Sequence, residues 1–176
     1  MQLRSYQQNL LNQVLALPAS TNPLIQLDTG AGKTPLMAAL IQHFAGDEVL
    51  VIAHRNILIE QASKHVAQGQ VKHHVIAAKP TIARCKLRSG AKWINESSPI
   101  HVASIDSLHS RIRHQRLAPI NPKRILIDEA HHAIEDNKWG KLQKLYPDAQ
   151  IIGFTATPCR ADGLGLSRKT NGLFDV

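Results

Sequence analysis

A lysine and a threonine follow two glycines in the segment Gly30-Ala31-Gly32-Lys33-Thr34. The segment lies between a short apolar run and a run whose apolar residues recur at helical spacing. A glycine-rich turn between a strand and a helix directs backbone N–H groups at an anion, and the helix N-terminus adds positive potential. In such a loop Lys33 would reach the β and γ phosphates of a nucleotide, and the Thr34 hydroxyl would ligate Mg²⁺.

The loop departs from the strict phosphate-binding pattern at one position. That pattern has a glycine six residues before the lysine, where this chain has Leu27. Taken alone, the segment is therefore also compatible with a glycine-rich turn that joins a strand to a helix and binds nothing.

Two adjacent acids, Asp128 and Glu129, follow the apolar run 125–127. An acid at the end of a buried strand can hold Mg²⁺ opposite Thr34, and the next acid can orient or deprotonate a water that attacks the γ-phosphate. The alternative is an acid pair at a helix N-terminus, which is favourable to the helix dipole and has no catalytic meaning. The phosphate loop favours the catalytic interpretation.

The pair His131-His132 follows these acids directly. Adjacent residues of a helix point about 100° apart, and no cysteine pair or His-Glu-x-x-His motif accompanies them, so a zinc site is not indicated. We expect His131 instead to link the nucleotide site to a neighbouring loop by hydrogen bonding.

The positive charge of the chain is concentrated in its middle third. The net charge of the 176 residues is +8, but residues 61–127 carry +10 and the other segments together carry −2. Such asymmetry favours a surface that binds a polyanion, nucleic acid first. A basic face kept for solubility is the alternative. Aromatic residues are 4% of the chain, so base stacking is not expected as the main mode of binding.

Apolar runs and helical patterns alternate along the chain, which predicts an α/β fold with a mainly parallel β-sheet and helices on both faces. Ser5 is the expected N-cap of the first helix, and residues 79–98 suggest only a basic surface segment around Trp93. The expected helices are 5–17, 33–44, 57–66, 105–112 and 138–146, and the expected strands are 23–25, 48–53, 71–77, 99–104, 123–128 and 150–158. In parallel sheets ligands bind beyond the carboxyl ends of the strands, and polar residues gather at these ends.

Composition and termini restrict the class of protein further. The chain has the length of one domain and lacks both the apolar core of a signal peptide and an apolar run of membrane-spanning length, so we expect a cytoplasmic protein with no membrane partner. The two cysteines, Cys85 and Cys159, are expected to be reduced thiols.

In these motifs the chain resembles the first RecA-like lobe of superfamily 2 helicases and nucleic-acid translocases, over nearly all of residues 1–176. The segment 28–34 is similar to motif I of that family, in which Leu27 is no obstacle, and Asp128-Glu129-Ala130-His131 matches motif II of the DEAH type. The segment 4–7 resembles the Q motif. The resemblance implies an ATP-dependent P-loop enzyme with ATP and Mg²⁺ as cofactors. It implies nucleotide contacts from Arg4, Gln7, Thr29, Gly30, Ala31, Gly32, Lys33 and Thr34, with Gln7 recognising adenine.

Further motifs of the family imply contacts with nucleic acid. Residues 51–61 are similar to motif Ia, where Arg55 is the candidate contact, and residues 102–108 resemble the next backbone-contacting motif, where Ser104 is the candidate. In the latter motif Asp106 replaces a common glutamine. Residues 155–157 match motif III, which implies a coupling role for Thr155 and Thr157 together with His131. The segment after residue 157 is similar to a bacterial DNA-repair and restriction-type branch, so DNA is expected as the partner rather than RNA.

The family's second lobe supplies an arginine finger, which can increase the rate of phosphoryl transfer about 10³–10⁵-fold. A second RecA-like lobe is absent from these 176 residues. We therefore expect one lobe, weakly active alone, with its partner lobe supplied in cis or in trans. Two alternatives remain open from the sequence. One is a P-loop ATPase that binds no nucleic acid. The other is a nucleotide-binding module without turnover or helicase activity, for example the motor lobe of a restriction-type complex.

Overall fold

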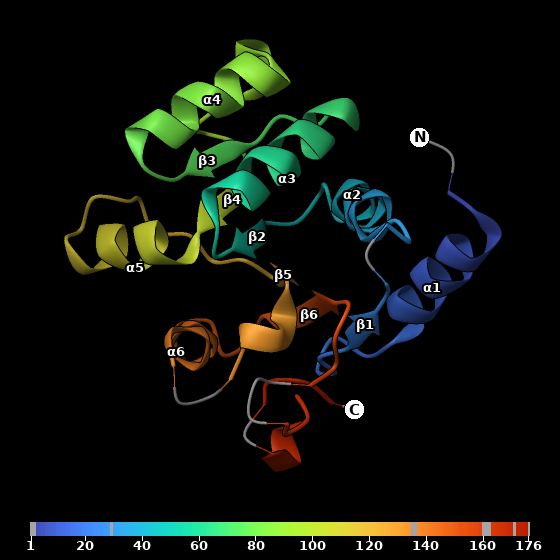
Figure 1. The fold of residues 1–176 in the computed structure, drawn as a ribbon. Coiled ribbons are helices and arrows are strands. Elements are labelled where there is room, and N and C mark those ends of the chain that lie inside the picture. The colour runs from blue at the N-terminus through green and yellow to red at the C-terminus, as the bar shows by residue number, and fades with distance from the viewer. Residues whose placement is uncertain (1–2, 29, 135–136, 160–162, 171, 176) are drawn as a thin grey trace.

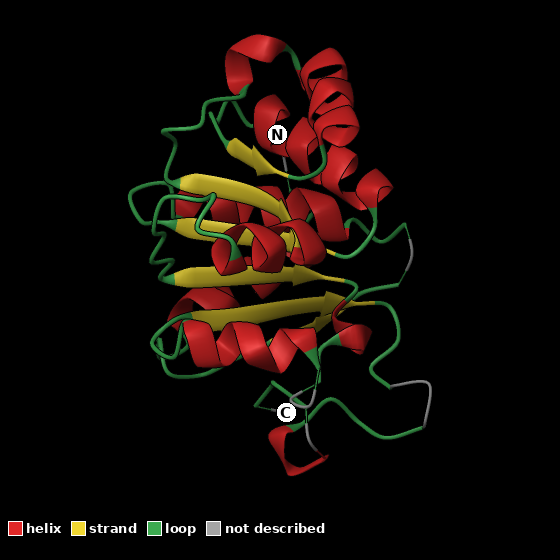
Figure 2. Ribbon diagram, turned by 90° about the vertical axis from the view of Figure 1, so that its left-hand side faces the viewer, coloured by secondary structure: helices red, strands yellow, loops and turns green. Residues whose placement is uncertain are grey.

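Parallel strands form one sheet in the computed structural model, which describes residues 3–28, 30–134, 137–159, 163–170 and 172–175. Six strands make up the sheet over these residues, in the order β1-β6-β5-β2-β4-β3 (Figures 1 and 2). Every pair of neighbours is parallel, so the prediction of a mainly parallel α/β sheet is confirmed. The strands are β1 Leu24–Gln26, β2 Val49–Ala53, β3 His74–Ile76, β4 Ile100–Ser104, β5 Arg124–Asp128 and β6 Gln150–Thr155.

Helices connect successive strands and cover both faces of the sheet. The α-helices are α1 Ser5–Ala16, α2 Lys33–His43, α3 Asn56–Gln68, α4 Lys79–Ser89, α5 Ile105–Arg113 and α6 Lys138–Leu145, and the short 3₁₀ helices are η1 Ala91–Trp93, η2 Ala130–His132 and η3 Arg168–Thr170. The apolar side chains of α1 to α4 pack on one face, and those of α5, α6 and the C-terminal segment pack on the other (Figure 1). None of the described helices is long and apolar enough to cross a membrane.

The strands β2, β4 and β6 are buried at every position and β5 is buried at its three middle positions, as continuous apolar runs predict for a covered parallel sheet. Successive residues of each strand contribute to opposite cores. In β2, Val49 and Val51 belong to the core under α1 to α4, whereas Leu50 and Ile52 belong to the core under α5 and α6. All six carboxyl ends lie at one edge, which therefore brings together the polar residues that follow the strands (Figure 2).

Residues 79–98 differ from the expectation of a basic surface segment. They contain the helix α4, which buries Thr81 and Cys85 against α3 and exposes its basic residues. This helix has few apolar residues, and polar contacts supply much of its attachment to α3. The buried carboxylate of Glu60 on α3 pairs with Nε of Arg84 at 2.5 Å and with Nε of Arg88 at 3.2 Å. Hydrophobic periodicity gives little signal for a helix that is held in this way.

The first helix begins at Ser5, as expected, but its N-cap residue differs from the expectation. Arg4, rather than Ser5, occupies the N-cap position, and its backbone N–H donates to Oε1 of Gln7 at 2.8 Å. The side chain of Gln7, which is 3% exposed, thus belongs to the helix start as well as to the surface that faces the loop after β1.

The C-terminal segment returns to the sheet beside β1 and β6. Asn22 donates through its side chain to the Leu173 carbonyl at 3.1 Å, and its backbone N–H donates to Asp175 at 2.7 Å. Phe174 is fully buried against β6. This segment has no regular sequence period, and its position depends on these contacts with residues distant in the chain.

Candidate nucleotide site

The loop between β1 and α2 has the backbone geometry of an anion cradle. Gly30 and Gly32 adopt φ values of +84° and +85°, a left-handed conformation that is costly for residues with a Cβ. The Ala31 N–H donates to the Asp28 carbonyl at 3.0 Å, which closes the turn, and α2 begins at Lys33. The loop thus presents its glycines, the first turn of α2 and the lysine at the carboxyl edge of the sheet. Thr29 lies outside the described residues.

The helix α1 holds this loop from one side. Nε2 of Gln7 donates to the Gly32 carbonyl at 3.0 Å, and the Tyr6 hydroxyl donates to the Ala31 carbonyl. A Cβ at Gly32 would lie 2.2 Å from Nε2 of Gln7, so this contact depends on glycine. Gln7, expected from the sequence to recognise adenine, makes its described contacts with the loop and with Arg4; adenine recognition stays a prediction. The Arg4 side chain is exposed.

The acid pair after β5 meets the lysine of the loop. Nζ of Lys33 lies 3.6 Å from Oε1 of Glu129, and the two side chains are 12% and 28% exposed. The strand β6 lies between β1 and β5 in the sheet, so only the tertiary fold brings these two residues together. A cation at a phosphate loop and a carboxylate beside it are the groups that nucleotide hydrolysis needs.

A chain of polar contacts continues from Glu129 toward β6. Oε2 of Glu129 lies 3.4 Å from Nδ1 of His131, and the same ring nitrogen lies 3.3 Å from Oγ1 of Thr155. The Thr155 hydroxyl donates to the Thr157 carbonyl at 2.8 Å. The structure therefore places the three residues expected to couple nucleotide state to nucleic-acid binding in one connected series; their role stays a prediction.

The backbone at the acid pair is unusual. Glu129 has φ and ψ of 53° and 53°, the left-handed conformation that a non-glycine residue adopts only at some cost. Its N–H donates to Oδ1 of Asp128 at 3.0 Å. This turn ends β5 sharply and starts the 3₁₀ helix η2. The acid pair therefore does not open an α-helix, which removes the structural alternative of a helix-dipole role.

Burial raises the pKa of Asp128 above its usual range, and the charge of Glu129 adds to this effect. The N–H of Glu129 and the charge of Lys33 act in the opposite direction. A carboxyl in this environment gains from a further positive charge nearby. Thr34 is the second residue of α2, and its hydroxyl makes no hydrogen bond with the described residues.

Arg55 lies two residues after β2, and Ser104 is the last residue of the neighbouring strand β4, where it pairs with Ala53. The Arg55 side chain is exposed and precedes α3, whereas Ser104 precedes α5 and is only 7% exposed. Both lie at the carboxyl edge of the sheet, and neither takes part in the contacts of the loop between β1 and α2 described above. Arg55 is thus accessible to a ligand, whereas Ser104 offers little surface in this conformation.

Two further histidines lie at the same edge. The ring of His54 contacts the ring of His132 with centroids 4.4 Å apart, and His132 contacts His131 at 4.1 Å. Both ring nitrogens of His54 are buried without a partner among the described residues. These rings join the segment before Arg55 to the segment after Glu129. In the sequence, His54 belongs to the polar end of β2 and His132 to the histidine pair after the acids, and neither signal indicates that the two rings meet.

The fold and the loop define a RecA-like, ATP-binding lobe of the helicase type. The chain belongs to the family described as "Type III restriction enzyme, res subunit", which matches residues 1–160. It is 27% identical over 95% of its length to irc3 of Schizosaccharomyces pombe, a mitochondrial ATP-dependent helicase by its name. It is 26% identical over 99% of its length to DHX58 of Mus musculus, named an ATP-dependent RNA helicase. The chain spans 28% and 27% of these relatives.

Solved structures share the fold at lower sequence identity. The helicase domain of Hef from Pyrococcus furiosus matches 89% of this chain with a TM-score of 0.67 at 20% identity, and the match covers 33% of that chain. The type ISP restriction-modification enzyme LlaGI, solved with a DNA substrate mimic, matches 94% with a TM-score of 0.64 at 15% identity, and the match covers 18% of that chain. The predicted RecA-like fold and the resemblance to superfamily 2 helicases are confirmed.

Proposed function

We propose that this lobe binds Mg·ATP at the loop 28–34 and hydrolyses it when a second RecA-like lobe completes the site, driving movement on or unwinding of DNA. The observation that carries the proposal is the contact between Lys33 and Glu129. It joins the candidate phosphate ligand to the candidate catalytic acid, from segments that are distant in the sequence.

The donor set suits Mg²⁺. This ion needs oxygen ligands, keeps several waters and commonly takes only one or two protein carboxylates. Asp128 and the Thr34 hydroxyl would hold it, and the buried carboxyl of Asp128 would gain a cation that offsets its desolvation. When bound, the ion would neutralise charge on the β and γ phosphates.

The remaining residues would position the phosphates and activate the attacking water. Lys33 would exchange its contact with Glu129 for the phosphates, which frees Glu129 to orient the attacking water or accept its proton. Glu129 has a left-handed backbone, and its Oε1 already lies 3.6 Å from Nζ of Lys33 in the loop. His131 would then report the state of Glu129 to Thr155 and Thr157 through its contacts with Glu129 and Thr155.

A Glu129→Gln variant tests the catalytic assignment in single-turnover ATP hydrolysis, with a second RecA-like lobe supplied in cis or in trans. We expect the chemical step to slow about 10²–10⁴-fold, because general-base catalysis contributes on this order, while ATP affinity is kept. Asp148→Asn is the control, since Asp148 is exposed and precedes β6, at the end of the sheet opposite the loop. A Glu129→Gln variant as fast as this control would refute the role of Glu129.

The choice of DNA rests on the basic middle third and on the fold shared with LlaGI, whose structure contains a DNA substrate mimic. DHX58, whose name describes an RNA helicase, makes RNA the competing partner. Binding of single- and double-stranded DNA and RNA, with and without nucleotide, separates them. Tighter binding of DNA supports the proposal; tighter binding of RNA overturns the choice of DNA, and no binding of either favours a P-loop ATPase without nucleic acid. Cytoplasmic location stays a prediction.

A further inference from the structure

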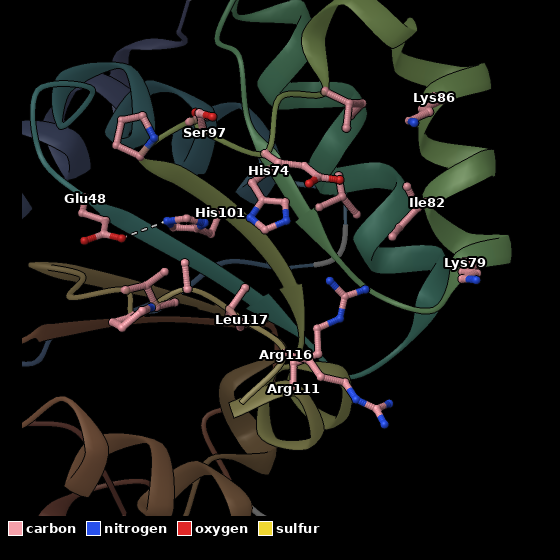
Figure 3. Close-up of a pocket in the computed structure, with 18 residues that line it drawn as sticks. Glu48, His74, Lys79, Ile82, Lys86, Ser97, His101, Arg111, Arg116 and Leu117 are labelled. Atoms are coloured by element: carbon pink, nitrogen blue, oxygen red, sulfur yellow. Dashed lines mark hydrogen bonds and ion pairs between the residues drawn. The ribbon is translucent and has the colours of Figure 1, made fainter. Parts of the chain in front are cut away.

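One end of the sheet carries a cavity that the nucleotide site does not use. It has a volume of about 730 Å³ and lies over the first residues of β3 and β4, between α4, α5 and the segment 114–120 (Figure 3). Parallel sheets are normally covered by helices on both faces. Here α3 and α4 cover one face of these strands, but the other face opens into the cavity. Its volume is within the range of about 300–1,000 Å³ that is typical of ligand sites.

Two histidines occupy the floor of this cavity, where a covered sheet would have apolar residues. His74 and His101 are register partners on adjacent strands, and their ring centroids are 5.6 Å apart. They are 9% and 4% exposed, and burial lowers the pKa of both, so the rings are neutral at pH 7. Figure 3 shows the two rings side by side.

The hydrogen bond of His101 determines which of its nitrogens can accept. Nε2 lies 3.0 Å from Oε1 of Glu48, and a carboxylate only accepts, so Nε2 carries the proton. The other oxygen of Glu48 accepts from the Asn121 N–H at 2.8 Å, which holds this carboxylate in place. Nδ1 of His101 is then a buried acceptor, and it has no partner among the described residues. A ligand that satisfies it must donate an O–H or N–H.

Four cations line the same cavity: Lys79 and Lys86 of α4, Arg111 of α5 and Arg116 of the segment that follows α5 (Figure 3). Nη2 of Arg111 donates to the Ala77 carbonyl at 2.7 Å, which orients the guanidinium, and the Arg116 N–H donates to the Arg111 carbonyl at 2.8 Å, which keeps the second arginine nearby. Lys79, Lys86 and Arg116 make no ion pair within the part of the chain that the structure describes. Two carboxylates, Glu48 and Glu96, oppose these four cations, so the lining is net positive.

We propose that this cavity binds a phosphorylated small molecule that also carries hydroxyl or N–H donors, of the sugar-phosphate or nucleoside-phosphate class. The guanidinium group of an arginine binds phosphate with charge-assisted hydrogen bonds, and the other cations of the lining add charge that a dianion matches better than a single carboxylate does. One donor of the ligand would take up Nδ1 of His101, which is buried in the unliganded protein, and another would contact the His74 ring. Its carbon skeleton would lie against Ile82 and Leu117 at the cavity wall.

Ribose 5-phosphate is the probe that tests this site, with the ring signals of His74 and His101 in ¹H–¹⁵N spectra as the readout. Saturable shifts of both rings are expected, and they should persist in a Lys33→Ala variant, because the nucleotide loop is not involved. Arg111→Gln with Arg116→Gln should weaken binding about tenfold or more, since charged hydrogen bonds are lost. Arg113→Gln is the control, because Arg113 is exposed on the same helix and does not line the cavity.

Three outcomes would overturn the proposal. The first is the absence of saturable shifts, or equal binding by the arginine variant and the Arg113 control. The second is equal binding of inorganic phosphate and ribose 5-phosphate, which would leave an anion site with no role for the hydroxyl donors. The third is that the rings respond to a single-stranded oligonucleotide or a polyglutamate peptide but not to ribose 5-phosphate, which would assign the cavity to a macromolecular partner.

Discussion

At the scale of single residues, Gly32 joins three parts of the candidate site. Its φ is +85°, its carbonyl accepts from Gln7, and it precedes Lys33 at the start of α2. The backbone of one residue therefore sets the loop, its contact with α1 and the position of the lysine. Such a residue tolerates almost no change.

A Gly32→Ala substitution should lower ATP affinity substantially. The added Cβ would lie 2.2 Å from Nε2 of Gln7, and the left-handed backbone would cost a further ~1–2 kcal/mol with an L side chain. Calorimetric titration with Mg·ATP measures the effect. Gly46→Ala is the control, because a Cβ at Gly46 meets nothing within 4 Å and its φ is not positive. Equal affinities of the two variants would contradict the assigned role of this loop.

His73 should make the protein less stable in mild acid. Burial lowers its pKa to about 4, and its neutral ring is bonded to Ser63 at 2.7 Å and to the Val71 carbonyl at 3.3 Å. The unfolded chain has the ordinary pKa of about 6.5, so it binds more protons between the two values. The contribution is fully present above pH 6.5 and is lost as the pH falls toward 4, by up to roughly 3 kcal/mol.

Denaturant unfolding of a His73→Gln variant across this pH range checks the prediction. Between pH 6.5 and 4, the free energy of unfolding should fall less for the variant than for the parent protein, because glutamine does not titrate. His114→Gln, at an exposed position, is the control. A profile for His73→Gln that is parallel to that of the parent would show that other groups cause the loss.

At the scale of elements, the C-terminal segment and β6 form one packed unit. A Cβ at Gly153 would lie 2.4 Å and 2.5 Å from two ring atoms of Phe174, so β6 is shaped to receive this ring. Gly153→Ala should reduce the free energy of unfolding by about 1–3 kcal/mol through overpacking. In a Phe174→Leu background the same change should cost less, because the nearest ring atoms are gone.

A double-mutant cycle measured by denaturant unfolding tests this coupling. The cost of Gly153→Ala should differ between the two backgrounds by more than the scatter of independent sites, about 0.5 kcal/mol. Additive effects would show that the ring and the strand do not share this contact in solution.

At the scale of the whole molecule, the sheet edge with Lys33, Glu129 and Arg55 is one surface and the basic cavity over β3 and β4 is another. The excess charge of residues 61–127 includes the cations of the cavity, so part of it does not lie at the expected nucleic-acid contacts. If Arg55 contacts a phosphate, its replacement should weaken binding of single-stranded DNA and flatten the salt dependence.

The salt dependence gives a quantitative check. The log–log slope of affinity against salt should be about −0.7 per phosphate contact on a single strand, so Arg55→Gln should reduce its magnitude by about 0.7. Arg168→Gln is the control, because Arg168 pairs with Asp175 at 3.0 Å in the C-terminal segment. Binding that is flat from low to moderate salt in the parent protein would exclude phosphate contacts as its basis.

The sequence by itself determined the sheet, the phosphate loop and the acid pair, because each depends on residues that are close together in the chain. Apolar runs and helical periodicity predict the sheet and its helices, and the spacing of glycine, lysine and acids predicts the loop and the acid pair. Helix α4 was not predicted, because a buried carboxylate anchors it and apolar periodicity is weak there. The N-cap of α1 is Arg4, whose N–H donates to Gln7, and not Ser5 as expected.

Only the tertiary structure decided which of these residues meet. The sheet order places β6 between β1 and β5 and brings Lys33 to Glu129, Gln7 to Gly32 and His54 to His132. It also leaves His74 and His101 facing a cavity instead of a helix. Such contacts join residues far apart in the chain, and they depend on strand order and packing, which no local spacing of residue types contains.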